Sequence, residues 1–278
     1  MSSAPALRIQ LLSDVHLEHD QGPGTSKYAY DFPVVADDLA LLGDIGNTKD
    51  EELFGWIDLQ LTRFKRVFYL AGNHEPYGWS LDESYARLSD YATTRSEPSA
   101  GRGAFVYLNR TQYDLSPTLT LLGCTLWSAL DPAHTSAIAK ISPDFKHTAN
   151  FDVRAYDSVH RADLAWLQQS IAALRTQEPH RQIVVFTHHA PTFAGAQDPK
   201  FDGGFAGSVF STELTGEEWW AAPPLSMWCF GHTHWTCDFD RGGVRVVSNQ
   251  RGYPSDGQSG FDPAKVVEIP ELGSSAAK

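Results

Sequence analysis

The sequence has few cysteines, and their pattern excludes a disulfide framework. The 278 residues contain three cysteines, Cys124, Cys229 and Cys237. An odd and sparse set is not typical of a small secreted protein held together by disulfides. A bridge between Cys229 and Cys237 is the alternative, and we favour reduced thiols packed beside a strand.

Long apolar runs and a secretion signal are also missing. No stretch of eighteen apolar residues occurs, so we expect no part of the chain to span a membrane. The opening residues, MSSAPALRIQLLSDVHLE, have neither a basic segment nor a signal-type apolar core. We therefore expect a cytoplasmic protein.

Positive charge is scarce. The chain has 22 Lys and Arg against 34 Asp and Glu, which gives a formal net charge of −12 and no basic cluster. Such a balance repels the phosphate backbone of nucleic acids, so we expect no nucleic-acid partner. Bound cations would reverse the local sign at a site. With 42% hydrophobic and 20% charged residues, the composition indicates one globular domain over residues 1–278.

Five short apolar runs each end in Asp, Asn or His, and helical patterns separate several of them. The runs are residues 6–14, 38–44, 66–75, 181–189 and 225–234. Helices are predicted over 49–64, 80–92 and 154–174, and more weakly over 211–221; further strands are predicted at 104–110, 118–127, 243–249 and 265–269. The pattern predicts an α/β fold, in which ligands bind at the carboxyl ends of parallel strands.

Three segments show no regular pattern, namely residues 18–33, 131–150 and 192–210. Long irregular segments in a compact domain are often functional. We interpret them as walls of a pocket, and Tyr28 in the first segment is a candidate to bind substrate.

The residues at the five strand ends are ones that bind metals. They are Asp14, His16, Asp44, Asn73, His74, His188, His189, His232 and His234. Imidazole and carboxylate ligands suit Zn, Fe or Mn. Two ions about 3.5–4 Å apart, sharing one carboxylate, would use more ligands than a single ion can hold.

The order of these motifs resembles the calcineurin-like metallophosphoesterase family. D-x-H stands at 14–16, G-D at 43–44, G-N-H-E at 72–75 and G-H-x-H at 231–234, with a strand-end His between the last two. The resemblance implies a four-layer α/β/β/α sandwich with two mixed sheets flanked by helices. It also implies two metal ions and hydrolysis of phosphate esters by a metal-bridging hydroxide. The tail GVRVVSNQRGY is similar to that of small members without an extra domain.

The resemblance also implies a role for each motif residue. It assigns Asp14, His16 and His234 to the first ion, Asn73, His188 and His232 to the second, and Asp44 to both. His74 would touch the phosphoryl group or protonate the leaving oxygen, oriented by Glu75 or another nearby carboxylate.

The resemblance leaves some assignments open. Position favours His188 over His189 as the ligand, although Pro191 gives His189 a competing claim, and His189 would then line the pocket. Arg251 is a further candidate to bind substrate.

The predicted substrate is a small organic phosphate ester, with a diester favoured because the motifs add no Arg or Lys to hold a second charge. The segment GDIGNTKDE lacks the Arg that phosphoprotein phosphatases of this superfamily carry. The alternatives are a phosphomonoesterase, a nuclease or RNA-processing phosphodiesterase, and a non-catalytic metal-binding scaffold.

Overall fold

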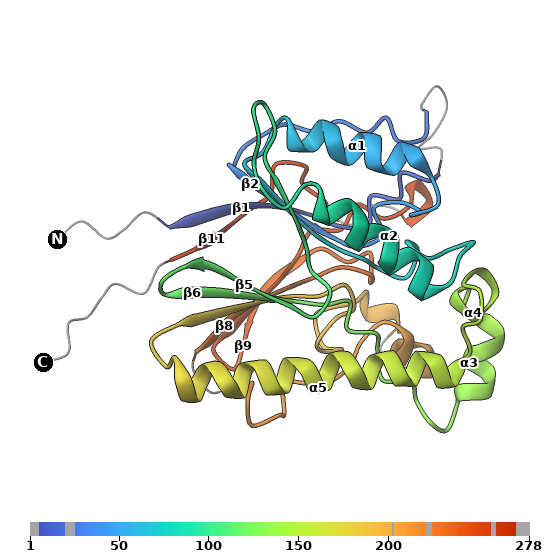
Figure 1. Cartoon of the computed structure of the whole chain (residues 1–278). Helices are drawn as coiled ribbons and strands as arrows, with labels where there is room; N and C mark the ends of the chain where they lie inside the picture. Colours follow the sequence, from blue (N-terminus) through green and yellow to red (C-terminus); the bar gives the residue numbers. More distant parts are fainter. Residues whose placement is uncertain (1–5, 20–25, 202, 221–223, 257–259, 271–278) are drawn as a thin grey trace, which may run out of the picture.

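Two β-sheets pack face to face between layers of helices (Figure 1). The computed structural model describes residues 6–19, 26–201, 203–220, 224–256 and 260–270. The first sheet has the order β11 (Val266–Ile269), β1 (Leu7–Leu12), β2 (Asp38–Leu42), β3 (Arg66–Leu70) and β4 (Ala104–Tyr107). Its strands β1 to β4 run parallel, and β11 pairs antiparallel with β1.

The second sheet repeats this plan with antiparallel strands at both edges. Its order is β5 (Thr111–Ser116), β6 (Leu119–Gly123), β7 (Gln182–Phe186), β8 (Leu225–Phe230), β10 (Val244–Ser248) and β9 (Cys237–Arg241). The four inner strands are parallel, whereas β5 and β9 are antiparallel to their neighbours. Both sheets are therefore mixed, as predicted.

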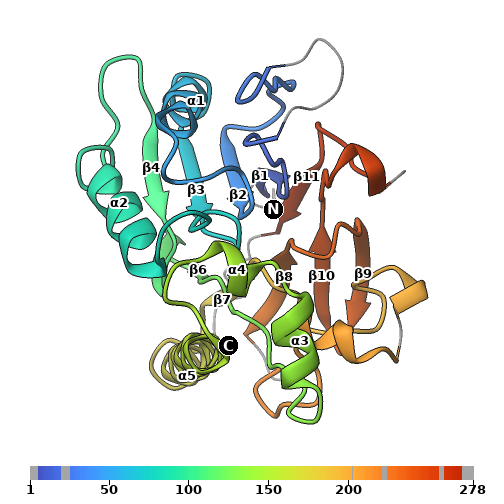
Figure 2. The ribbon, with the colours of Figure 1, turned by 90° about the vertical axis from the view of Figure 1, so that its right-hand side faces the viewer.

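Helices cover the outer faces of the two sheets. In Figure 1, α1 (Glu51–Leu61) and α2 (Leu81–Thr93) lie over the first sheet and α5 (Val153–Gln177) lies along the second. Two short helices, α3 (Thr135–Ile141) and α4 (Asp144–His147), lie at the end of the molecule that faces the viewer in Figure 2. Short 3₁₀ turns span Pro199–Phe201, Phe205–Val209 and Pro254–Asp256. The four-layer sandwich is confirmed.

The inner strands are apolar on both faces because both faces are buried. The core between the sheets includes Ile9, Phe68, Val184 and Cys229, all of which are fully buried. Alternate residues pack outward against the helices, which explains the continuous apolar runs of the sequence. None of the helices in the described part of the chain has the length and apolarity that crossing a membrane requires. All three cysteines are free thiols, as expected.

Three sequence expectations differ from the structure. The predicted helix at 211–221 is wrong: residues 211–220 form a bridge and turns, and residue 221 lies outside the described part. Strands β5 and β9 were not predicted, because their alternately exposed residues carry polar side chains. The segment 131–150 is not wholly irregular, since it contains α3 and α4.

Candidate metal centre

The carboxyl ends of five parallel strands bring the predicted ligands together at one end of the molecule, the end viewed in Figure 2. Asp14 and His16 follow β1, Asp44 follows β2 and Asn73 follows β3. His188 follows β7, while His232 and His234 follow β8. All are buried except the half-buried His234. Three groups at these strand ends could each hold a metal ion: Asp14, His16 and His234; Asp14, Asp44 and His188; and His188, His189 and His232.

Left-handed backbone turns aim these side chains into the shared space. Nine non-glycine residues of the described chain have positive φ, and five of them are predicted ligands: Asp14, His16, Asp44, His232 and His234, with φ of 49–71°. This conformation costs an ordinary residue about 1–3 kcal/mol and persists where the surroundings enforce it, which is typical of functional sites.

Two motif glycines allow the close approach of these turns. A Cβ at Gly72 would collide with Asp44 Oδ1 and would lie 2.7 Å from Asp44 N. A Cβ at Gly231 would lie 2.7 Å from Asp14 Oδ2. The glycines of the G-N and G-H motifs are therefore required by the space that the carboxylates occupy.

The first group of ligands presents facing lone pairs. His16 Nε2 and His234 Nε2 are 3.1 Å apart, and His234 Nε2 is 3.5 Å from Asp14 Oδ1. The other ring nitrogen of each histidine faces a carboxylate: His16 Nδ1 lies 3.2 Å from Glu18 Oε1, and His234 Nδ1 lies 2.5 Å from Asp256 Oδ2. These carboxylates favour protons on both Nδ1 atoms, so both Nε2 atoms are acceptors, and a cation between them satisfies both.

The second group shows the same arrangement. His188 Nδ1 donates to the carbonyl oxygen of Leu42 at 2.8 Å, so its Nε2 is an acceptor. That Nε2 nevertheless faces two more acceptors, Asn73 Oδ1 at 3.0 Å and Asp44 Oδ1 at 3.4 Å. Asn73 Nδ2 donates to Asp144 at 2.9 Å, which fixes Oδ1 on the side of His188. His232 Nε2 is buried without a hydrogen-bond partner among the described residues.

Asp44 lies between the two groups. Its Oδ1 belongs to the second, and its Oδ2 lies 3.9 Å from His16 Nε2 in the first. Ligand atoms about 2.0–2.2 Å from one ion lie roughly 3.0–3.5 Å apart, so most of these spacings suit coordination. The donor set and its geometry therefore fit two cations.

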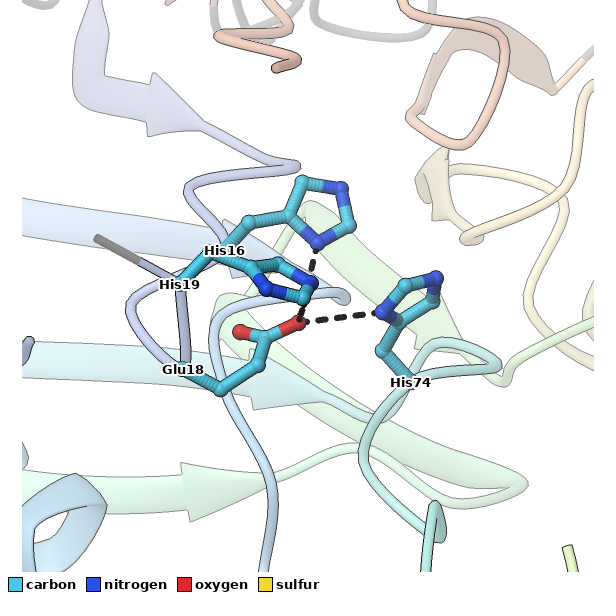
Figure 3. A group of neighbouring side chains, drawn as sticks. All are labelled: His16, Glu18, His19 and His74. Carbon is cyan, nitrogen blue, oxygen red and sulfur yellow. Dashed lines mark hydrogen bonds and ion pairs between the residues drawn. The ribbon is translucent and has the colours of Figure 1, made fainter. Parts of the chain in front are cut away.

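His74 lies beside this centre and is held by Glu18. Figure 3 shows Glu18 Oε1 at the meeting point of three imidazoles, with His74 Nδ1 at 3.0 Å, His16 Nδ1 at 3.2 Å and His19 Nε2 at 3.5 Å. Burial would lower the pKa of His74, yet Asp44 and Glu18 together raise it to about 9. The contact with Glu18 leaves His74 Nε2 on the side of Asp44, whose Oδ2 lies 3.9 Å away.

Glu75 does not contact the His74 ring. Its carboxylate accepts from the backbone N–H groups of Gly72, Asp44 and Ile45 and from the hydroxyl of Tyr69. It thereby ties the turn after β3 to the turn after β2. The carboxylate that orients His74 is Glu18, only two residues after His16 in the sequence.

The three predicted substrate-binding residues have different surroundings. The Tyr28 hydroxyl donates to Asp50 at 2.7 Å. Arg251 donates to the carbonyl oxygen of Val15 at 3.2 Å, and its guanidinium lies 4.0 Å from the centre of the Tyr30 ring. His189 packs on His232, with ring centres 4.0 Å apart. Tyr28 and Arg251 thus support the loops around the centre, whereas His189 lines it.

The irregular segments each supply a contact to the candidate centre. Glu18 comes from 18–33 and Asp144 from 131–150, while Phe210 of 192–210 lies with its ring 5.2 Å from that of His232. Asp144, Asp256 and Tyr253 were not among the predicted site residues. Glu18 was not among them either, although it lies in SDVHLE, and Tyr253 ends the tail GVRVVSNQRGY.

Comparisons with known proteins show the family of the chain. Residues 7–236 match the family described as calcineurin-like phosphoesterase. The chain belongs to this family and is a metal-dependent phosphoester hydrolase, and the family uses a centre of two divalent metal ions.

Two kinds of relative were found. The chain is 26% identical over 279 residues to uncharacterized protein L509 of Acanthamoeba polyphaga mimivirus, covering 95% of this chain and 97% of the relative. Its fold is similar to that of phosphopantetheinyl hydrolase (PptH) from Mycobacterium tuberculosis, with a TM-score of 0.68, 16% identity and 99% of each chain covered. A dimetal phosphatase from Danio rerio gives a TM-score of 0.52 at 13% identity, covering 96% of this chain and 94% of that one.

Replacing Glu18 by glutamine should lower activity without removing the metals. The amide keeps the size of the side chain, but it carries no charge and its oxygen is a weaker acceptor for protons on the Nδ1 atoms of His16 and His74. Loss of such a partner typically costs about 10–100-fold in activity or metal affinity. Turnover and metal content of Glu18→Gln would be measured beside Glu83→Gln, which removes the remote carboxylate of the α2 capping box. Equal turnover of Glu18→Gln and the unmodified protein would contradict the role of Glu18.

Proposed function

We propose that this chain hydrolyses a small organic phosphodiester at a centre of two transition-metal ions. One observation carries the proposal. In each of two groups of side chains, hydrogen-bond acceptor atoms face one another with no donor between them, and Asp44 lies between the two groups. Asp14, His16 and His234 would hold one ion, Asn73, His188 and His232 would hold the other, and Asp44 would contact both. The imidazole and carboxylate donors suit Mn, Fe or Zn.

Each part of the reaction has a group to perform it. When bound, two such ions neutralise phosphate charge and lower the pKa of a coordinated water, which supplies the nucleophile. His74 would give its Nε2 proton to the leaving oxygen as the P–O bond breaks. Glu18 keeps His74 oriented through Nδ1, at 3.0 Å. His188 is favoured over His189 because its Nε2 faces both Asn73 and Asp44.

The charges favour a diester over a monoester. Arg251, the cationic residue of the loop after β10, donates to the Val15 carbonyl and stacks over Tyr30. These contacts direct the guanidinium to the protein. A monoester carries one more negative charge than a diester and would need a cationic side chain to bind that charge. The net charge of −12 favours a small substrate over nucleic acid. The neighbour from Mycobacterium tuberculosis is named a phosphopantetheinyl hydrolase, consistent with an organic phosphate ester here. The free thiols suit a reducing compartment such as the cytoplasm.

Bis-p-nitrophenyl phosphate and p-nitrophenyl phosphate test the proposal directly. With Mn²⁺ supplied, we expect kcat/KM to be roughly 10–100-fold higher for the diester, since one missing charged hydrogen bond costs about 1.5–3 kcal/mol. Negligible turnover of both esters would contradict hydrolysis. Faster turnover of the monoester would instead identify a phosphomonoesterase. Inhibition that grows steeply with salt for an oligonucleotide substrate would favour a nuclease.

A further inference from the structure

We propose that the hydroxyl of Tyr253 binds the phosphoryl group, donating a hydrogen bond to a non-bridging oxygen during hydrolysis. This inference rests on the proposed function and assigns a substrate-contacting role to a residue outside the metal motifs. It is carried by the position of the ring, the anchoring of its backbone and the direction of its hydroxyl.

The ring of Tyr253 packs against the two histidines of the first ligand group. It stacks on His16 with ring centres 4.3 Å apart and planes 28° apart. Its other contact is edge-to-face with His234, at 4.9 Å and 70°. The tyrosine is therefore positioned by the same imidazoles that would hold the first ion.

The backbone before Tyr253 is tied to the turn that follows β1, and the backbone of Tyr253 itself is tied to Asp256. Arg251 N donates to the carbonyl oxygen of Ser13 at 3.1 Å, and Gly252 N donates to that of Asp14 at 3.0 Å. Tyr253 N donates to Asp256 Oδ2 at 2.7 Å, the same oxygen that faces His234 Nδ1. A group held on several sides in this way is preorganised for a contact in the transition state.

The hydroxyl of Tyr253 lies 3.2 Å from His74 Nε2. Since Glu18 takes the Nδ1 side of His74, Nε2 is the nitrogen that would deliver a proton to the leaving oxygen. The leaving oxygen and the non-bridging oxygens share one phosphorus atom. A donor one hydrogen bond away from the acid is therefore within reach of a non-bridging oxygen when the ester is bound.

The chemistry of the phenol suits this role. It is a donor that adds no charge, which matches a phosphodiester monoanion better than a dianion. In the free protein the hydroxyl pairs with His74, and substrate binding exchanges that hydrogen bond for one to the phosphoryl oxygen. No covalent bond to Tyr253 forms or breaks. Donors aimed at oxygens where charge develops are among the larger contributions to catalysis.

Tyr253→Phe is the test, because it keeps the stacked ring and removes only the hydroxyl. We expect kcat to fall by roughly 10²-fold, as for loss of one such donor, with two metals still bound. The loss should be similar for p-nitrophenyl and alkyl esters, because the bond is to a non-bridging oxygen. Calorimetry with inorganic phosphate on the Mn-loaded protein should show binding weaker by roughly tenfold. Tyr91→Phe, which removes a hydroxyl bonded to Asp58 in the outer layer, is the matched control.

The outcomes separate this inference from the proposed function. If the unmodified protein hydrolyses esters and Tyr253→Phe matches it in rate and phosphate affinity, the Tyr253 inference is wrong and the proposed function stands. Loss of metal from Tyr253→Phe, or a loss of rate that grows for poorer leaving groups, would overturn the inference by showing that the hydroxyl acts through the ligands or through His74. If the unmodified protein neither turns over esters nor binds phosphate, the proposed function fails first and the inference with it.

Discussion

Replacing Asp44 by asparagine is expected to lower kcat/KM by at least about 10³-fold and to reduce the metal content below two ions per chain. Asp44 Oδ1 lies 3.4 Å from His188 Nε2, and its Oδ2 lies 3.9 Å from His16 Nε2, so one carboxylate faces both groups of candidate ligands. The amide is nearly the same size but carries no charge. Metal ions contribute several kcal/mol to the transition state, and each 1.4 kcal/mol is tenfold in rate.

The asparagine variant should still fold. Asp44 Oδ1 accepts from His74 N at 2.8 Å, and the amide oxygen of asparagine can accept the same hydrogen bond. Metal analysis and ester turnover would be compared with Asp58→Asn, which removes a carboxylate paired with Arg95 in the helical layer. Two firmly bound ions and unchanged turnover in Asp44→Asn would show that this carboxylate does not join the two groups.

The strand ends could be predicted from the sequence because their signal is local. Each buried strand is an apolar run, and each run ends in a residue that can bind a metal. The topology then follows from general rules: parallel strands place their carboxyl ends at one edge, where ligands bind. His188, which follows β7, and Asp44, which follows β2, meet although 144 residues separate them. The capping box at Ser80 and Glu83 was likewise predictable, since it involves residues three apart.

The sequence gives misleading local signals for two strands and for one segment that was expected to be helical. Strands β5 and β9 carry residues such as Asp114 and Asp238 because they lie at the edges of their sheet, where one side meets solvent. The expected helix at 211–221 is prevented by turn chemistry. Glu213 accepts hydrogen bonds from both the backbone and the hydroxyl of Thr215, and Gly216 follows. Trp219 and Trp220 instead pack into the core of the second sheet.

The residues that contact and orient the candidate ligands could not be predicted, since they lie far from those ligands in the sequence. Asp144 bonds Asn73 over 71 residues, and Tyr253 reaches His74 over 179 residues. Asp144 lies in no motif, and the tail segment that ends in Tyr253 does not indicate a contact with His74. Asp256 likewise meets His234 only through the turn that follows β10. Local patterns predict the candidate ligands, whereas the three-dimensional packing determines which carboxylates orient them.

Replacing His74 by asparagine is expected to separate proton transfer from metal binding. If His74 protonates the leaving oxygen, the loss should reach about 10²–10⁴-fold for an alkyl ester, whose alkoxide needs the proton. A p-nitrophenyl ester leaves as a stable anion, so its rate should fall far less. Metal content should stay at two, because the His74 ring is directed to Glu18 and Tyr253.

The measurement is a series of esters with leaving groups of increasing pKa, assayed with Mn²⁺, with His180→Asn as an exposed and remote control. A steeper dependence of kcat/KM on leaving-group pKa in His74→Asn is the expected signature of a lost general acid. An equal loss across the series would assign His74 to phosphoryl binding instead, and loss of one ion would make it a ligand. Because Glu18 holds Nδ1 of this histidine, Glu18→Gln should steepen the same dependence more weakly, whereas Tyr253→Phe should leave its slope unchanged. The three variants together thus distinguish the acid, the residue that positions it and the donor to the phosphoryl group.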